Sequence, residues 1–193
     1  MAKAYRNFWA LNQDEAFTAG YLRDYFNKKE VAVSFPLDSQ LKDTDLFLNN
    51  IQNNKSIKLQ VKGSRAYEPK PHEIRKYNAG SPGWYFPSKK SIMKSTADYF
   101  IFLNPVINES MKRGRRFIEP HLIIIPTKKL QKLCKEYKSP HGKSRFSFYF
   151  WINPKEKKAF DYRDRLYDLS GYLDDKGLKM LEKRITGAKQ KAK

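Results

Sequence analysis

Apolar and polar residues alternate most regularly over residues 56–64, which read SIKLQVKGS. A period of two residues is typical of a β-strand with one face buried and the other face polar. The polar face of this predicted strand carries Gln60 and Lys62, two residues apart. That face is either simply solvated or part of a site, and the sequence around it bears on the choice.

The same pattern analysis predicts alternating helices and strands along the rest of the chain. Residues 14–29 place apolar side chains at helical spacing, a second helix begins at Thr127, and a third helix with a basic tail covers residues 176–193. The turn-rich sequence NNIQNNK precedes residues 56–64 and predicts an antiparallel hairpin with the strand before it. The other predicted strands cover residues 31–37, 43–48, 97–103, 121–126 and 145–152.

This order of elements predicts an α/β or α+β fold around a mixed central sheet. With 193 residues and 40% apolar content, the chain is expected to form one domain over residues 1–175, followed by the helix and tail of residues 176–193. Residues 64–95 are rich in Pro, Gly, Tyr and basic side chains and are predicted to form a long inserted loop. A loop of that length inside a compact domain usually has a function or is disordered.

The basic residues are concentrated after residue 50. Residues 1–50 contain 6 basic and 7 acidic side chains, whereas residues 51–193 contain 33 basic and 13 acidic side chains, a net charge of +20. Lysine and arginine supply most of the sequence-independent affinity of proteins for phosphate backbones. The distribution of charge therefore favours a nucleic acid as the partner over a soluble protein that happens to be basic.

Composition also disfavours several classes of protein. No apolar run reaches about 18 residues, so neither a membrane-spanning helix nor a membrane partner is expected. The opening sequence MAKAYRNFWALNQDEA contains no long apolar run, which argues against a signal peptide. Cys134 is the one cysteine, which excludes an intramolecular disulfide and a cysteine-rich zinc site and makes a cytoplasmic location the simplest expectation.

Four polar side chains are expected to converge on the polar face of the predicted hairpin. Gln60 and Lys62 point the same way along their strand, and Asp45 shares their face in a suitable register of the hairpin. Glu15, or its neighbour Asp14, belongs to the first turn of the preceding helix and is expected above the same sheet. Each of them also has a purely structural interpretation, as part of a solvated strand face, a strand start or a helix terminus.

Such a cluster has a chemical meaning because its oxygens suit a hard cation. Oxygens from Asp45, Gln60 and Glu15 are the kind of ligand that Mg²⁺ prefers. The bound ion would lower the pKa of a water molecule and stabilise negative charge on a phosphate group. The ammonium group of Lys62 can orient that water or stabilise the developing charge. The cluster is therefore a candidate site for phosphodiester chemistry.

The order and spacing of Asp45, Gln60 and Lys62 resemble the motif of the PD-(D/E)XK nuclease superfamily, over roughly residues 14–126. The early Glu15 on the first helix is similar to the Holliday-junction-resolvase-like and restriction-endonuclease-like branches. The resemblance implies a restriction-endonuclease-like mixed β-sheet flanked by helices, and hydrolysis of phosphodiester bonds with Mg²⁺ or Mn²⁺. It also implies that all four residues are catalytic, with Asp45, Gln60 and Glu15 as metal ligands.

Two positions depart from the motif that gives the superfamily its name. Thr44 stands before Asp45 in place of the proline, and Gln60 stands where an acidic residue is usual. The glutamine removes one negative charge from the expected metal site. It therefore bears directly on metal affinity and on catalysis.

Basic and aromatic side chains alternate in residues 64–95, a combination suited to following a phosphate backbone while bases stack on the rings. A second basic run, MKRGRRF, lies between two predicted strands. An aromatic-anchored surface loop and a solvated tip are the structural alternatives. The candidate nucleic-acid-binding residues are Arg65, Lys70, Arg75, Lys76, Trp84, Tyr85, Lys89, Lys90, Lys94, Lys112, Arg113, Arg115 and Arg116.

These observations favour a metal-dependent endonuclease, acting on DNA rather than RNA in bacterial defence, repair or mobile-element processing. One alternative is a nuclease-fold module that binds nucleic acid without cutting it, which Gln60 keeps open. Another is a basic RNA-binding protein without a metal site. The oligomeric state also stays open, with a homodimer as one of the alternatives.

Overall fold

The computed structural model describes residues 13–36, 43–110, 115–137, 144–164 and 166–187. Within these ranges the chain forms two β-sheets and five α-helices, so the predicted mixed α/β class is confirmed. No helix in this described part has the length and apolar content needed to cross a bilayer.

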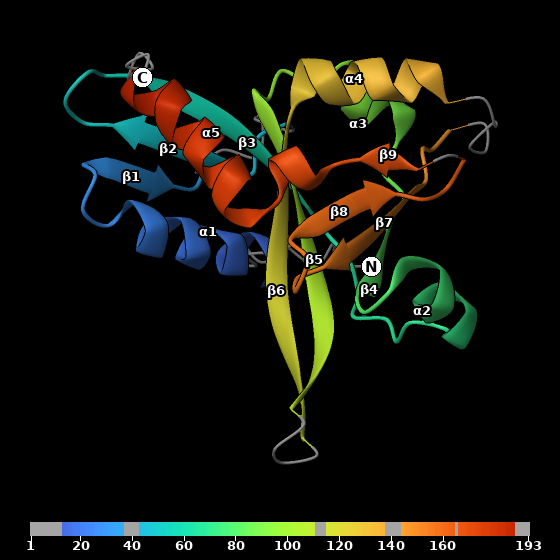
Figure 1. Cartoon of the computed structure of the whole chain (residues 1–193). Coiled ribbons are helices and arrows are strands. Elements are labelled where there is room, and N and C mark those ends of the chain that lie inside the picture. Colours follow the sequence, from blue (N-terminus) through green and yellow to red (C-terminus); the bar gives the residue numbers. More distant parts are fainter. Residues whose placement is uncertain (1–12, 37–42, 111–114, 138–143, 165, 188–193) are drawn as a thin grey trace, which may run out of the picture.

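The first sheet contains the predicted hairpin. Its strands are β1 (Val31–Ser34), β2 (Leu46–Asn50), β3 (Ser56–Gly63), β5 (Tyr99–Ser110) and β6 (Arg115–Pro126). They are arranged in the order β1-β2-β3-β5-β6 (Figure 1). β2 and β3 pair antiparallel, as predicted, whereas β3 and β5 pair parallel. The sheet is therefore mixed, and β3 lies at its centre.

A second, antiparallel sheet lies beside the first. Its strands are β4 (Ser81–Tyr85), β7 (Phe148–Asn153), β8 (Lys158–Asp161) and β9 (Tyr167–Asp168). They are arranged in the order β4-β7-β8-β9, which makes β4 an edge strand of this sheet.

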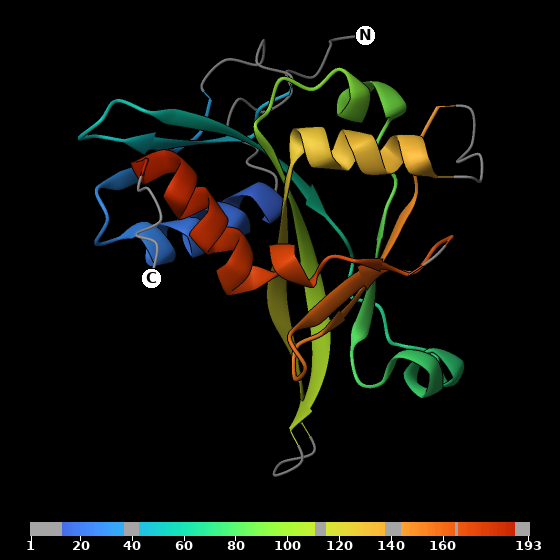
Figure 2. The same cartoon turned by 45° about the horizontal axis from the view of Figure 1, so that its top comes forward.

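The helices lie in two main groups. They are α1 (Gln13–Phe26), α2 (Pro71–Tyr77), α3 (Lys89–Met93), α4 (Thr127–Glu136) and α5 (Asp174–Thr186), with a 3₁₀ turn, η1 (Ser170–Tyr172), before α5. α1 and α5 pack on one face of the first sheet, whereas α3 and α4 lie side by side and α4 contacts β5 and β6 on the other face (Figures 1 and 2). The hydroxyl of Tyr25 on α1 donates to Glu182 on α5 at 2.8 Å, which links the two helices of the first group.

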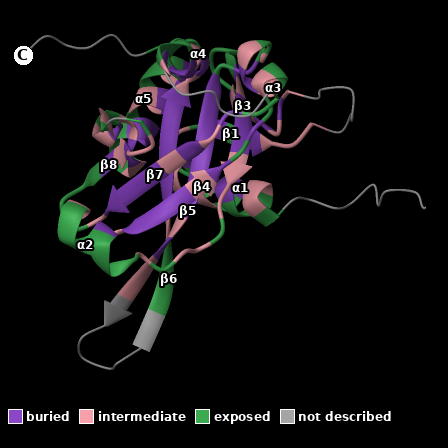
Figure 3. Cartoon of the chain, turned by 90° about the vertical axis from the view of Figure 1, so that its right-hand side faces the viewer, coloured by how far each residue is buried: buried purple, intermediate pink, exposed green. Residues whose placement is uncertain are grey.

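β5 and β6 are shared by two hydrophobic cores, because successive side chains of a strand point to opposite faces. On one face, Ile101 and Leu103 of β5 pack with apolar residues of α1 and α5. On the other face, Phe100 and Phe102 pack with apolar residues of β4, β7 and α4. Figure 3 shows β5 and β7 buried along much of their length, whereas α2 is mostly exposed. The two sheets are therefore expected to unfold together.

The prediction that residues 64–95 form a long loop is wrong. This segment contains α2, β4 and α3, and β4 pairs along its whole length with β7. Pro82 and Gly83 are typical of a turn, but an edge strand such as β4 tolerates a proline. Gly83 is required here, since a Cβ atom would lie 1.7 Å from Oδ1 of Asn104 on β5. Contacts with β7 and β5, which are distant in the sequence, therefore stabilise a strand where the local sequence predicted a turn.

The hairpin of β5 and β6 is longer than the sequence pattern indicated. Its pairing runs from Tyr99 with Pro126 to Ser110 with Arg115, beyond the predicted strands at residues 97–103 and 121–126. Figure 1 shows the hairpin projecting past the other strands of both sheets. Exposed Phe117 and other surface residues occupy this extension, so backbone pairing rather than burial defines its length.

A buried carboxyl group on β8 makes the stability of the fold depend on pH. Asp161 is buried, and its oxygens accept hydrogen bonds from the Tyr137 hydroxyl and from the backbone N–H groups of Tyr149 and Arg163. Burial outweighs these bonds and raises the pKa of Asp161 to about 6. The folded chain therefore keeps this proton at pH values where the unfolded chain has lost it.

The contribution of Asp161 to the free energy of unfolding should be fully present below about pH 4 and lost as the pH rises through about 6. The loss should amount to roughly 2–3 kcal/mol. In Asp161→Asn the side chain is neutral at every pH, so the difference in stability between wild type and variant should carry this dependence. Urea denaturation of both proteins between about pH 4 and about pH 8 measures it. A difference that stays constant with pH would contradict the raised pKa.

Candidate active site and nucleic-acid interface

The pairing of β2 with β3 brings Asp45 next to Gln60. Leu46 pairs with Leu59, and the backbone N–H of Asp45 donates to the carbonyl of Leu59 at 2.8 Å. β2 begins at Leu46, whereas β3 continues to Gly63. The last residues of β3 therefore extend past the start of β2. There the backbone N–H and carbonyl of Val61 bond to side chains instead of to β2.

Asp45 is the centre of a small polar cluster. Its Oδ2 atom accepts hydrogen bonds from Nε2 of Gln60 and, at 2.7 Å, from the backbone N–H of Val61. Nζ of Lys62 lies 3.9 Å from the same oxygen and donates to the carbonyl of Val61 at 2.9 Å. The structure thus brings together three of the four predicted catalytic residues, on one face of the β2–β3 hairpin.

This face of the hairpin looks toward the second core, because Gln60 and Lys62 are in register with Phe100 and Phe102 of β5. The side chains of Asp45 and Lys62 are only 16% and 28% exposed. Burial raises the pKa of Asp45, against the opposing effects of the Lys62 charge and of its hydrogen bonds. A poorly hydrated carboxylate gains more than an exposed one from an added positive charge.

Burial and neighbouring charges have opposite effects on the pKa of Lys62. Burial lowers the pKa of Lys62, whereas the negative charges of Asp45, Glu15 and Asp43 raise it. Glu15 therefore lies within electrostatic range of the cluster, as part of the first turn of α1. Glu15 thus influences the cluster through the effect of its charge on Lys62, and its role as a metal ligand stays a prediction.

The first turn of α1 is packed tightly against the end of β3. A Cβ atom on Gly63 would lie 1.9 Å from Oδ2 of Asp14, so a larger side chain at this position would have to displace the carboxyl group of Asp14. Burial raises the pKa of Asp14. Gly63 thus allows the acidic start of α1 to lie against the end of β3.

The side chains around Asp45 fit a hard cation in part. Among the described residues, no group of three His, Cys, Asp or Glu side chains is arranged to hold a metal. The carboxylate of Asp45 and the carbonyl of Val61 are oxygen donors of the kind that Mg²⁺ prefers. Gln60 turns its Nε2 toward Asp45, so the amide must rotate before its oxygen can bind a cation shared with Asp45.

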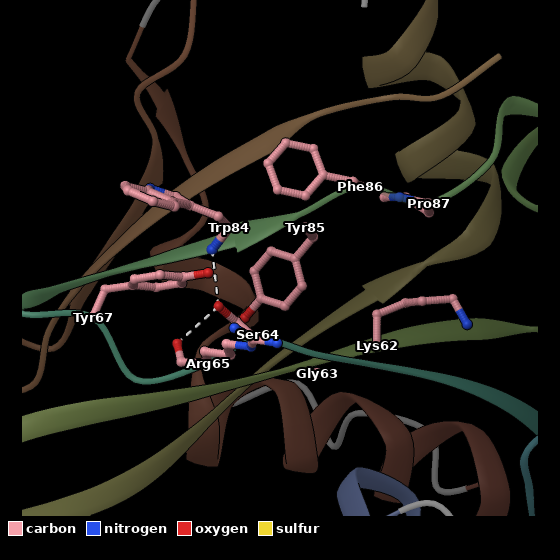
Figure 4. Close-up of a pocket in the computed structure, with 9 residues that line it drawn as sticks. All are labelled: Lys62, Gly63, Ser64, Arg65, Tyr67, Trp84, Tyr85, Phe86 and Pro87. Atoms are coloured by element: carbon pink, nitrogen blue, oxygen red, sulfur yellow. Dashed lines mark hydrogen bonds between the residues drawn. The ribbon is translucent and has the colours of Figure 1, made fainter.

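A pocket of about 330 Å³ opens next to this cluster (Figure 4). Lys62 lies at one end of the pocket, and Tyr67 and Trp84 lie at the other end. The rings of Tyr67 and Trp84 are tilted by 31°, with their centroids 4.2 Å apart. Arg65 and Phe86 also line the pocket, and both are exposed. Basic and aromatic side chains therefore occur together beside the candidate site.

Tyr85, which was predicted to bind nucleic acid, belongs mainly to the core and lines the inner wall of the pocket. Its side chain is 2% exposed, and its hydroxyl donates to the carbonyl of Leu103 at 3.0 Å. Neighbouring side chains of a strand point to opposite faces, so Trp84 and Phe86 are turned away from the core while Tyr85 is turned toward it. The alternation along β4 is hidden in the sequence by Pro82 and Gly83.

The other predicted nucleic-acid contacts form separate groups. One group surrounds α2 and another surrounds α3, and these helices lie at opposite ends of the second sheet (Figures 1 and 2). The groups are Lys70, Arg75 and Lys76 around α2, and Lys89, Lys90 and Lys94 around α3. Lys112 and Arg113 lie outside the described residues, and so do the side chains of Arg115 and Arg116.

Lysines on α4 extend the basic surface of α3 and were not among the residues predicted to bind nucleic acid. α4 packs against α3, where Nε2 of Gln131 donates to the carbonyl of Ile92 at 3.0 Å. The signal was present in the sequence, because lysines alternate there with the buried Leu130 and Leu133 at helical spacing. The exposed lysines of α4 are Lys128, Lys129, Lys132 and Lys135.

Comparison with known proteins identifies no relative: no family model, curated protein or solved structure matches this chain. The chemistry of the site therefore has to be inferred from its own residues. These combine a carboxylate, an amide and an ammonium group at the start of β2 with a basic and aromatic pocket beside them.

Proposed function

We propose that this protein is a metal-dependent nuclease that hydrolyses phosphodiester bonds in DNA. The observation that carries the proposal is the contact of Asp45 with Gln60 and Val61, with Lys62 at 3.9 Å, beside a pocket lined by basic and aromatic side chains. This arrangement supports the resemblance to the PD-(D/E)XK superfamily, since the residues of the resembling motif share one face of a sheet flanked by helices.

Asp45 and the carbonyl of Val61 would hold the divalent cation, with the amide oxygen of Gln60 after rotation of its side chain. When bound, the cation supplies an activated water molecule and neutralises charge on the phosphate group. Lys62 places an ammonium group next to Asp45, where it can donate to a phosphate oxygen or to the attacking water. Glu15 would contribute negative charge that favours the cation.

The charge of the chain supports a polyanionic substrate. Residues 51–193 carry a net charge of +20, and the α3–α4 surface displays lysines from both helices. A phosphate backbone can therefore be attracted over a much larger area than the site itself. The lysines of α3 and α4 would hold DNA, while the Asp45 cluster would act on one phosphate.

One specific observation favours the alternative of a binding module that does not cut. Oδ2 of Asp45 already accepts two hydrogen bonds, and Gln60 adds no negative charge to the cluster. A site with a single central carboxylate binds Mg²⁺ less strongly than one with two. In this alternative the cluster would only stabilise the start of β2.

Cleavage assays distinguish these two functions. Supercoiled plasmid, single-stranded DNA and RNA would be incubated with the full chain and Mg²⁺ or Mn²⁺, with EDTA as the control. We expect cleavage of at least one DNA substrate that requires the metal. Binding of DNA with no cleavage under any of these conditions would favour the binding module, and faster cleavage of RNA than of DNA would overturn the proposed substrate.

Gln60→Glu should lower the Mg²⁺ concentration that gives half-maximal cleavage, on the order of tenfold, because a carboxylate ligand adds negative charge to the site. Gln52→Glu is the matched control, since it makes the same change on the exposed turn between β2 and β3. Cleavage rate against metal concentration measures both variants. An unchanged metal dependence in Gln60→Glu would show that residue 60 does not contact the cation.

A further inference from the structure

The aromatic end of the pocket beside Lys62 is rigidly built. Nε1 of Trp84 donates to the hydroxyl of Tyr162 at 3.1 Å, and that hydroxyl donates to Glu73 at 3.2 Å. The backbone N–H of Trp84 donates to Oγ of Ser64 at 2.9 Å. One bond holds the indole ring of Trp84 and the other holds its backbone, so a partner can stack on this region at little entropic cost.

The pocket exposes aromatic surface that the core does not use. Tyr67 and Trp84 are only partly buried, and Phe86 is 47% exposed. The large aromatic residues of the second core, such as Phe102 and Phe150, are fully buried by comparison. Exposed rings gathered in one pocket suit a flat, apolar ligand face, and nucleobases stack on such rings.

The same pocket contains two cationic side chains, Lys62 near the end of β3 and Arg65 in the segment that follows β3. Figure 4 shows Lys62 at the end of the pocket away from Trp84 and Tyr67. A nucleotide combines a flat base with a phosphate, so its two parts match the two ends of the pocket. The charge and the rings together indicate a nucleotide rather than an apolar metabolite or peptide.

The size of the pocket indicates whether that nucleotide is paired or unpaired. Its volume of about 330 Å³ is at the lower end of the range for small-ligand sites. In a duplex the faces of each base are covered by stacked neighbours, so rings in a pocket can reach only a base that is unpaired or flipped out. One base with its sugar suits this pocket, whereas an intact base pair does not.

We propose that the pocket formed by Lys62, Arg65, Tyr67, Trp84 and Phe86 binds one unpaired nucleotide of DNA, with the base on the rings and a phosphate near the cations. This inference deepens the proposed function, because the bound nucleotide would lie next to the phosphate that the Asp45 cluster acts on. The substrate class is then DNA with a single-stranded or locally opened segment.

Binding without cleavage tests this inference. A fluorescently labelled single-stranded oligothymidine, a blunt duplex, and the same duplex with one unpaired central nucleotide would be titrated with the full chain in EDTA. The wild type should prefer the single strand and the bulged duplex to the blunt duplex. Trp84→Ala should weaken binding of the first two by roughly 5- to 150-fold, the range expected for loss of one base–aromatic stack, and should change the blunt duplex by less than about twofold.

Two further variants keep the test clear. Phe86→Ala removes an exposed ring of the pocket and should weaken the same two ligands without affecting folding. Phe117→Ala removes an exposed ring from β6, away from the pocket, and should change no affinity. Equal losses for single strand and blunt duplex, or no loss in both pocket variants, would overturn the proposed pocket.

The outcomes for the pocket and for the nuclease are separate. A preference for unpaired DNA that depends on Trp84, in a protein that never cleaves, would support the pocket and reject the nuclease. Cleavage that depends on Asp45, with no effect of Trp84 or Phe86 on binding, would support the nuclease and reject the pocket.

Discussion

Asp45→Asn should reduce the rate of DNA cleavage by at least about 100-fold, as expected when a preorganised charged group is removed from a catalytic site. The asparagine keeps the size of the side chain and can still accept a hydrogen bond from Val61, so the hairpin should remain intact. Affinity for DNA in EDTA should change by less than about twofold, because the lysines of α3 and α4 are unaffected. Single-turnover cleavage and fluorescence anisotropy measure the two quantities.

Asp45→Asn has a matched control, Asp43→Asn, and a second variant in the same cluster, Lys62→Met. Asp43→Asn removes a carboxylate two residues away, in the segment before β2. It should leave cleavage within about threefold of the wild type, because Asp43 acts on Asp45 only through its charge. Lys62→Met keeps most of the side-chain volume and should lower the rate as strongly as Asp45→Asn. If Asp45→Asn and Lys62→Met both cleave at the wild-type rate, the Asp45 cluster is not the active site.

Phe102→Ala should lower the free energy of unfolding by roughly 3–5 kcal/mol, the usual cost of removing a fully buried phenylalanine. Phe102 is buried between the two sheets, where its ring centroid lies 5.0 Å from those of Tyr85 and Phe150. The alanine would leave a cavity at the contact that joins β5 to β4 and β7. Urea denaturation, followed by circular dichroism and by tryptophan fluorescence, measures the change.

The comparison variant is Phe17→Ala, which removes the same side chain from an exposed position on α1 and should cost less than about 1 kcal/mol. Trp151 is fully buried in the second sheet and contributes to the fluorescence signal. The two signals should change at the same urea concentration in wild type, because β5 and β6 belong to both cores. Separate transitions, or a small effect of Phe102→Ala, would show that the sheets are independent.

The local pattern of the chain was sufficient for the hairpin and the main helices. Alternation with a period of two residues placed Ile57, Leu59 and Val61 in the core and turned Gln60 and Lys62 to the other face. This holds because the geometry of a strand leaves two directions for side chains. The mixed α/β class, the antiparallel pairing of β2 with β3, and the helices α1, α4 and α5 follow from signals within short windows of sequence.

The candidate site was predictable to the extent that it depends on this hairpin. The contact of Asp45 with Gln60 requires only that Leu46 pairs with Leu59, which the buried alternation on both strands favours. The role of Val61 was not predictable, because it arises from backbone groups that β2 leaves unpaired where it begins. Any residue except proline at position 61 could make these contacts with its backbone, so the residue type does not reveal them.

The pocket and the second sheet were decided by tertiary structure alone. β4 forms despite Pro82 and Gly83 because β7, more than sixty residues away, supplies its backbone partners, and because Gly83 allows Asn104 to approach. That pairing turns Tyr85 into the core and leaves Trp84 to meet Tyr67. The sequence by itself determined which residues are apolar, basic or aromatic and which face of a regular strand they take. Only the pairing of distant strands decided which of those aromatic residues are exposed, since the free energy of burial depends on partners that no local window contains.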